Sequence, residues 1–293
     1  MKTRIISGII MGLVVAAVLV LGFYVSPYFT TAFIAIVAAV GCYELLHNAA
    51  GIKSKAAVYT ACAYTALSII LRDGTLYLYI TSPLMTSLYD EKKKFAYFIA
   101  SNWSVFPTIL TVLYFIFSVC VILKCHKDFD LAKIVTLSAM PLFLSYAFSS
   151  LGAILNHTSG LFYLLLLLNF SSVCDMGAYF VGVTLGKHKL CPEISPKKTV
   201  EGALGGLASS IIFSIVIVLS FSLPEKLIAT LILTIPLCIL GMLGDLFASS
   251  IKRSVNLKDY GSLIPGHGGI LDRVDSILMI APLLYLCIRV GVL

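Results

Sequence analysis

The amino-acid sequence predicts an all-α, polytopic integral membrane protein with about nine transmembrane helices in a single membrane domain, residues 1–293. Hydrophobic residues make up 59% of its 293 residues and charged residues only 12%, and its mean hydropathy is +1.01. An ordinary soluble domain carries roughly twice that charged fraction. Because a spanning helix needs about 20 apolar residues, the length leaves room for about eight or nine spans joined by short connections.

Apolar runs long enough to cross hydrocarbon give the expected spans, which are residues 5–24, 27–46, 56–72, 98–124, 134–155, 159–182, 203–222, 226–248 and 273–291. The first run continues to about Tyr24 without a small-residue cleavage site, which favours a spanning helix over a secretory signal. The stretch 73–103 is the weakest, because polar residues and the charge run Asp90 to Lys94 interrupt it. A short or re-entrant segment is the alternative there.

Basic residues predict the orientation in the membrane, because cytoplasmic loops carry an excess of lysine and arginine. With the N-terminus in the cytosol, the inside loops contain Lys53, Lys55, Lys124, Lys127, Lys133, Lys187, Lys189, Lys197, Lys198, Lys252, Arg253 and Lys258. Only the cluster Lys92 to Lys94 lies on the wrong side. Both polar loops of the C-terminal half then face the cytosol. The absence of an organellar transit segment favours a bacterial plasma membrane.

Two further observations exclude other classes of protein. The eight cysteines are scattered, mostly in apolar runs, and show no zinc or CxxC spacing, so we interpret them as small buried residues. The net charge of +7 fits basic cytoplasmic loops and does not indicate a nucleic-acid partner. Residues 1–155 supply helices with little motif content, whereas residues 159–293 carry the catalytic helices and cytoplasmic loops.

Asp175 lies near the end of an otherwise apolar span. A charge within hydrocarbon costs several kcal/mol, so such an acid usually faces a partner or a water-filled cavity. At helical spacing, Asp175 shares a face with Tyr179, Gly182 and Gly186. The alternative is a close contact between helices along a stripe of small residues.

A second polar segment follows, from Gly186 to Gly206, and includes the run Ser195 to Gly202. It combines lysines, hydroxyl groups and glycines with exposed N–H groups, which are the components of a phosphate cradle at the start of a helix. The order of a Walker A sequence is absent. An ordinary basic loop that touches anionic lipid is the alternative.

The third polar segment is the richest in charge. On a helix, Asp245, Ser249 and Lys252 would share one face, and Asp272 could meet Asp245 across the intervening loop. Carboxylates of this kind suit Mg²⁺, which binds through one or two carboxylates together with waters and substrate phosphates. For Asp272 and Asp275 the alternative is that both are merely acids favoured by the positive end of the last helix, and this alternative is the stronger for Asp275.

Cations also gather at this membrane boundary, and snorkelling side chains would explain only one or two of them. They are Lys252, Arg253, Lys258 and Arg273. We expect them to hold phosphate groups. The turn from Pro265 to Gly269 can bring backbone close to a ligand, with His267 as donor or proton carrier, although a lone histidine is often incidental.

The segment from Ser249 to Asp275 resembles a known family. The pattern Ser249-x-Ile251-Lys252-Arg253-x4-Lys258-Asp259-x-Gly261-x2-Ile264-Pro265-x-His267-Gly268-Gly269-x2-Asp272-Arg273-x-Asp275 is similar to the signature of the phosphatidate cytidylyltransferases, or CDP-diacylglycerol synthases, without a departure. The segments around Asp175 and Ser195 are also similar to characteristic stretches of that family. The resemblance therefore covers about Asp175 to Asp275.

The resemblance implies transfer of CMP from CTP to phosphatidic acid in the membrane, giving CDP-diacylglycerol and pyrophosphate with Mg²⁺. By this analogy, Asp245, Asp272 and Asp275 would hold the metal, while the cations named above, His267 and Asp175 would serve catalysis. Substrate binding would fall to Ser195, Lys197, Lys198, Thr199 and Ser249. We leave open a second, monovalent cation and a homodimer.

Two other functions remain as alternatives. A transporter also has acids and glycine-interrupted helices within the membrane, but the chain shows no internal repeat, and its polar residues cluster at one boundary. A membrane enzyme of another CTP-dependent type, such as a polyprenol or phytol kinase, is the nearer rival. It would release CDP in place of pyrophosphate.

Overall fold

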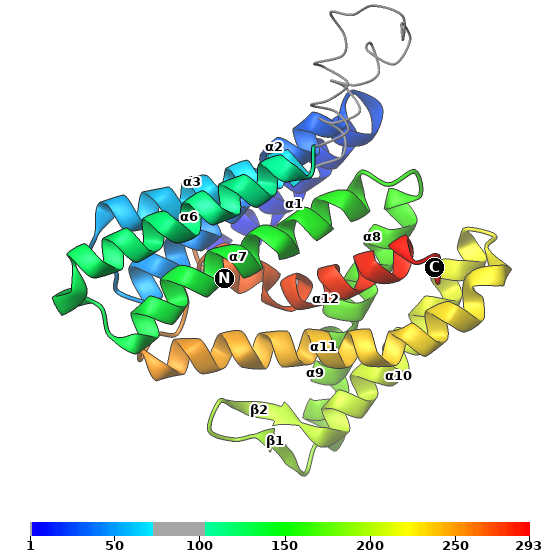
Figure 1. Cartoon of the computed structure of the whole chain (residues 1–293). Helices are drawn as coiled ribbons and strands as arrows, with labels where there is room; N and C mark the ends of the chain where they lie inside the picture. Colours follow the sequence, from blue (N-terminus) through cyan, green and yellow to red (C-terminus); the bar gives the residue numbers. More distant parts are fainter. Residues whose placement is uncertain (1, 73–102) are drawn as a thin grey trace, which may run out of the picture. The chain divides into compact units, whose positions relative to one another are not determined.

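The computed structural model describes residues 2–72 and 103–293 (Figure 1). Helices dominate the described residues, which confirms the expected all-α class. The chain divides into two compact units. Unit 1 comprises Met1–Asn156 and Tyr260–Ile270, and unit 2 comprises His157–Asp259 and Leu271–Leu293. The border near residue 156 lies where the motif-poor part of the sequence ends, but the later segment Tyr260–Ile270 belongs to unit 1.

Unit 1 is a group of helices in which α2 packs against α1, α3 and α7. Its elements are α1 (Lys2–Tyr24), α2 (Pro27–Tyr43), η1 (Glu44–Ala49), α3 (Lys55–Arg72), α6 (Val105–Lys124), η3 (His126–Asp128) and α7 (Leu131–Leu155). Proline at the first helical position and the Ser26 side chain start α2, because both suit the N–H groups that a helix leaves unpaired. The segment η1 continues α2 as a π-helix.

Unit 2 has two closely packed helix pairs, α9 with α10 and α11 with α12. Its elements are α8 (Gly160–Leu168), η4 (Asn169–Val173), α9 (Cys174–Leu185), β1 (Lys189–Cys191), β2 (Ser195–Thr199), α10 (Val200–Ser220), η5 (Pro224–Lys226), α11 (Leu227–Ser254) and α12 (Leu271–Arg289). In Figure 1, α9 and α10 lie side by side, with the hairpin at one end.

Seven helices among the described residues are long and apolar enough to cross a membrane. They are Ile6–Tyr24, Pro27–Ala49, Val105–Lys124, Leu131–Leu155, Gly160–Leu185, Val200–Ser220 and Pro224–Ser254. The protein is therefore a polytopic integral membrane protein, as predicted. The other two expected spans correspond to α3 and α12, which are helical but less apolar. The charge run Asp90 to Lys94 lies outside the described residues.

Glycine permits the close contact between α9 and α10. A Cβ on Gly206 would lie 2.6 Å from the Cys174 carbonyl oxygen, and one on Gly202 would lie 2.6 Å from that of Ala178. A larger residue at either position would force the helices apart. This small-residue packing, weighed above as the alternative for Asp175, is thus present beside that acid without excluding a cavity there.

Residues 189–199, expected as a loop, form an antiparallel hairpin instead. Lys189 pairs with Thr199, and Cys191 pairs with Ser195. Thr199 then ends β2 and caps α10, because its Oγ1 accepts the Gly202 N–H at 3.1 Å. The sequence did not predict this hairpin because its strands are short and polar. Its effect is to hold the lysines of this segment at the start of α10.

Candidate active site

Five carboxylates line a cavity of about 460 Å³ in unit 2, which we call the acidic pocket. Its charged residues are Asp175, Asp245, Lys252, Asp259, Asp272, Arg273 and Asp275, and Ser171, Ser172, Ser276 and Ile277 complete it. Asp175 occupies the first turn of α9, directly after the π-helical segment η4. The acids expected to converge from α11 and α12 do line one cavity.

A second cavity of about 520 Å³, the hairpin pocket, lies between the hairpin and the helices α9, α10 and α11. The hairpin contributes Lys189, Leu190, Ser195, Lys197, Lys198 and Thr199, and the helix α9 contributes the predicted face of Asp175, Tyr179 and Gly182. Asp175 and Asp245 line both pockets. The two pockets therefore adjoin at these carboxylates.

Two ion pairs connect the elements around the pockets. Lys198 Nζ lies 2.6 Å from Asp245 Oδ2 and links the hairpin to α11. Although buried, this ammonium makes no hydrogen bond of good geometry with a described residue, so it keeps donor capacity for a ligand. Lys252 Nζ donates to Asp272 Oδ1 at 2.7 Å and links α11 to α12.

The ion pair of Lys252 with Asp272 is buried. The two side chains are only 9% and 2% exposed. Charges so far from water require a partner, because desolvation costs several kcal/mol per ion. Lys252 is thus fixed against a carboxylate at the wall of the acidic pocket, where it is one of two basic side chains.

The acidic pocket has the donors that a hydrated divalent cation requires. Its five carboxylates outnumber its two basic side chains, so the pocket has an excess of negative charge. Among the described residues, no group of three His, Cys, Asp or Glu residues forms a ready cage for a metal. This arrangement fits Mg²⁺, which needs only one or two carboxylates when waters and substrate phosphates supply the remaining ligands.

Three predicted residues of unit 2 line neither pocket. Ser249 is half-buried on α11, and Lys258 is exposed beyond its end. Arg253 is exposed as well, and its Nη1 donates to the Leu257 carbonyl at 3.1 Å. Arg253 thereby satisfies a carbonyl group just after the helix, which is a usual structural role of arginine there. The roles predicted for these three residues stay predictions.

His267 lies in the loop Tyr260–Ile270 of unit 1 and lines neither pocket of unit 2. The loop contains a tight turn in which Ile264 N donates to the Gly268 carbonyl at 2.9 Å. Gly266 and Gly268 have φ values of 78° and 84°, a region that favours glycine. Ser7 of α1 holds His267, with 2.9 Å between its Oγ and the ring Nδ1.

The sequence model described as "Cytidylyltransferase family" matches residues 2–290 of the chain. The chain belongs to the cytidylyltransferase family. The family resemblance predicted from the motifs is thereby confirmed, and membership favours the transferase over the transporter.

Several relatives of this cytidylyltransferase family member are named phosphatidate cytidylyltransferase. The protein of Bacillus subtilis is 51% identical over 111 residues, which are 38% of this chain and 41% of that protein. The protein of Staphylococcus saprophyticus is 47% identical over 127 residues, which are 43% of this chain and 49% of that protein. The matched stretches thus span about half the length of these curated relatives, or less.

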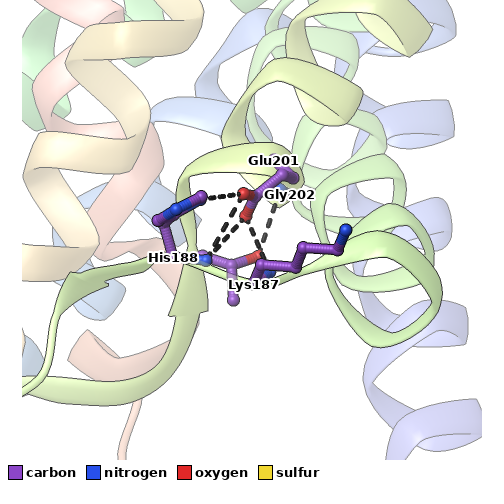
Figure 2. A network of polar contacts seen from close by, with 5 residues as sticks. Lys187, His188, Glu201 and Gly202 are labelled. Atoms are coloured by element: carbon purple, nitrogen blue, oxygen red, sulfur yellow. Dashed lines mark hydrogen bonds and ion pairs between the residues drawn. The ribbon is translucent and has the colours of Figure 1, made fainter.

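Glu201, to which the sequence analysis gave no role, anchors the hairpin of this family member (Figure 2). Its carboxylate accepts the N–H groups of Lys187 and His188 at 3.0 and 3.1 Å. It also lies 2.6 Å from the His188 Nδ1. These contacts tie the start of α10 to the chain that enters β1, so Glu201 fixes the base of the hairpin.

For the CMP transfer proposed below, we expect Glu201→Ala to raise the KM for CTP about tenfold and to change kcat by less than about threefold, because misplacing the hairpin weakens positioning of a bound ligand without removing a group from the acidic pocket. Steady-state assays at varied CTP concentration would measure both constants. Glu225→Ala is the matched control, because it also deletes a carboxylate but in the distant segment η5. An unchanged KM would contradict this role.

Proposed function

We propose that this protein transfers CMP from CTP to phosphatidic acid and thereby forms CDP-diacylglycerol and pyrophosphate for phospholipid synthesis. The observation that carries the proposal is the pair of adjoining pockets, one walled by hairpin lysines and one by carboxylates, which share Asp175 and Asp245. The names of the relatives support the same reaction.

In the proposed reaction, a phosphate oxygen of phosphatidic acid attacks the α-phosphorus of CTP. The new P–O bond forms as the bond from the α-phosphorus to the bridging oxygen of pyrophosphate breaks. Both reactants are polyanions, so positioning and charge neutralisation should dominate catalysis. A phosphate monoester is already largely ionised at neutral pH, so no dedicated strong base is needed.

The hairpin pocket suits the triphosphate of CTP. Lys189, Lys197 and Lys198 line it together with the hydroxyl groups of Ser195 and Thr199. The Lys198 ammonium is already desolvated and keeps donors that a phosphate oxygen can accept. We therefore assign Lys198 to the triphosphate, next to its present partner Asp245.

The acidic pocket suits the reacting phosphates and the metal. Asp245, Asp272 and Asp275 would hold Mg²⁺, with Asp175 between the two pockets. When bound, Mg²⁺ supplies neutralisation and orientation of phosphate oxygens. Arg273 and Lys252 would neutralise the lipid phosphate. The Lys252 side chain is already buried before any substrate binds. A second, monovalent cation stays a prediction.

A site of this kind must receive CTP from water and acyl chains from the bilayer. The spans of this integral membrane protein satisfy the second requirement. We propose that the loops around the pockets face the cytosol of a bacterial cell, as the lysine distribution predicts. The bacterial relatives support this location. The homodimer stays a prediction that light scattering on the purified protein would check.

The proposed function is tested with CTP labelled at its α-phosphate, phosphatidic acid in detergent micelles and Mg²⁺. We expect label to enter chloroform-soluble lipid with release of an equal amount of pyrophosphate. Transfer of label from the γ-phosphate instead, with release of CDP, would identify a lipid kinase. Folded protein that moves neither label into lipid would overturn the proposal.

A further inference from the structure

Unit 1 contains a buried carboxylate inside one of its membrane helices. Glu44 is 3% exposed and begins the π-helical segment η1 within the candidate span Pro27–Ala49. A carboxylate at this position costs several kcal/mol unless it is compensated, and such residues usually have a functional partner. π-Helical turns inside α-helices also occur frequently at functional sites.

Glu44 contacts the loop Tyr260–Ile270, which belongs to the same unit. Ile270 N donates to Glu44 Oε1 at 3.0 Å. A Cβ on Gly261 would lie 2.5 Å from Oε1, and a Cβ on Gly269 would lie 2.5 Å from Oε2. A Cβ at either position would require the Glu44 carboxylate to move, which accounts for glycine at both. Backbone conformation does not explain it, since neither residue has a positive φ.

A second contact from η1 holds the other end of the loop. Asn48, four residues after Glu44, donates from Nδ2 to the Tyr260 carbonyl at 2.8 Å. The Tyr260 residue is itself 1% exposed. One short segment thus fixes the loop at its first residue and at its last.

The backbone joins the two ends of this loop to residues of the acidic pocket. Asp259 immediately precedes Tyr260, and Asp272 follows Ile270 by two residues. Both aspartates line the pocket. We infer that Glu44 and Asn48 are positioning residues, which fix the two ends of the loop and, through the backbone, restrain the pocket residues Asp259 and Asp272 that are joined to those ends. This inference rests on the proposed function.

Glu44→Gln tests the inference while keeping the side-chain volume. Because a displacement of about 1 Å can cost about 100-fold in rate, we expect kcat for CMP transfer to fall about 10- to 100-fold. The KM for CTP should change by less than about threefold, because the hairpin pocket contains no loop residue. Ser68→Ala is the control, since this buried hydroxyl of unit 1 donates within its own helix. Asn48→Ala is a milder variant should Glu44→Gln reduce expression.

A double-mutant cycle separates positioning from general destabilisation. Gly269→Ala should displace the Glu44 carboxylate and reduce kcat about as much as Glu44→Ala does. In the double variant, we expect the second substitution to add less than about twofold, because contacting residues are not additive. Independent, multiplicative losses would overturn the inference, as would a normal kcat in Glu44→Ala.

Amide hydrogen exchange keeps this test independent of the reaction. Residues 260–270 should exchange faster in Glu44→Gln than in the wild-type protein or in Ser68→Ala, because the Ile270 amide loses a charged acceptor. Unchanged exchange would refute the role of Glu44 in holding the loop. If the wild-type protein transfers no CMP, the proposed function and the effect of Glu44 on catalysis are both refuted. Faster exchange in Glu44→Gln would in that case still show that Glu44 holds the loop.

Discussion

Asp245→Ala is expected to reduce CMP transfer by more than about 100-fold while the protein remains folded. Groups that merely orient a metal ligand already contribute about 10- to 100-fold, and Asp245 is a proposed ligand itself. It also lines both pockets, so no other group except Asp175 has the same position between them. Transfer of labelled CMP, measured across a range of Mg²⁺ concentrations, would give the loss.

Two controls make this result specific to Asp245. Lys55→Ala removes an exposed charge from unit 1 and should leave the rate unchanged. Asp245→Asn keeps the size of the side chain and should lose nearly as much activity as the alanine variant. The unfolding temperature should fall less in the two Asp245 variants than in Asp272→Ala, because the carboxylate of Asp245 is 30% exposed, although the Lys198 ammonium beside it is buried. A rate near that of the wild-type protein would refute the assignment to the metal.

Asp272→Ala is expected to abolish transfer and also to destabilise unit 2. The substitution leaves the Lys252 ammonium buried without the carboxylate that lies 2.7 Å away. Breaking a buried ion pair from one side costs about 3–5 kcal/mol. Thermal unfolding in detergent should show this loss together with the loss of activity.

The variant Lys252→Met/Asp272→Leu separates the two effects. Replacing both members of a buried ion pair by apolar residues is often neutral or stabilising. We therefore expect the double variant to unfold near the wild-type temperature and to remain inactive. Recovery of activity with stability would show that the pair only holds α11 to α12 and would remove Asp272 from the proposed metal site.

The sequence was sufficient to predict the membrane class and the convergence of polar residues in unit 2. The reason is energetic, because an acid such as Asp175 in an apolar span must find a polar environment. The same reasoning applies to Glu44, which lies in the expected span 27–46 outside any of the motifs.

Other features depend on contacts that hydropathy cannot show. The hairpin strands are too short and polar to produce an apolar alternation. The partner of Glu44 lies 226 residues away in the chain. The π-helical turns at Glu44 and Asn169 leave the apolar character of their spans unchanged.

The assignment of Tyr260–Ile270 to unit 1 has a consequence for biosynthesis. Chains insert and fold from the N-terminus during synthesis. When α2 enters the membrane, the ribosome has yet to make the loop amide that Glu44 accepts. Unit 1 therefore reaches its final packing only after nearly the whole chain has been translated. A ribosome that stalls before Tyr260 leaves an acidic membrane helix without this contact.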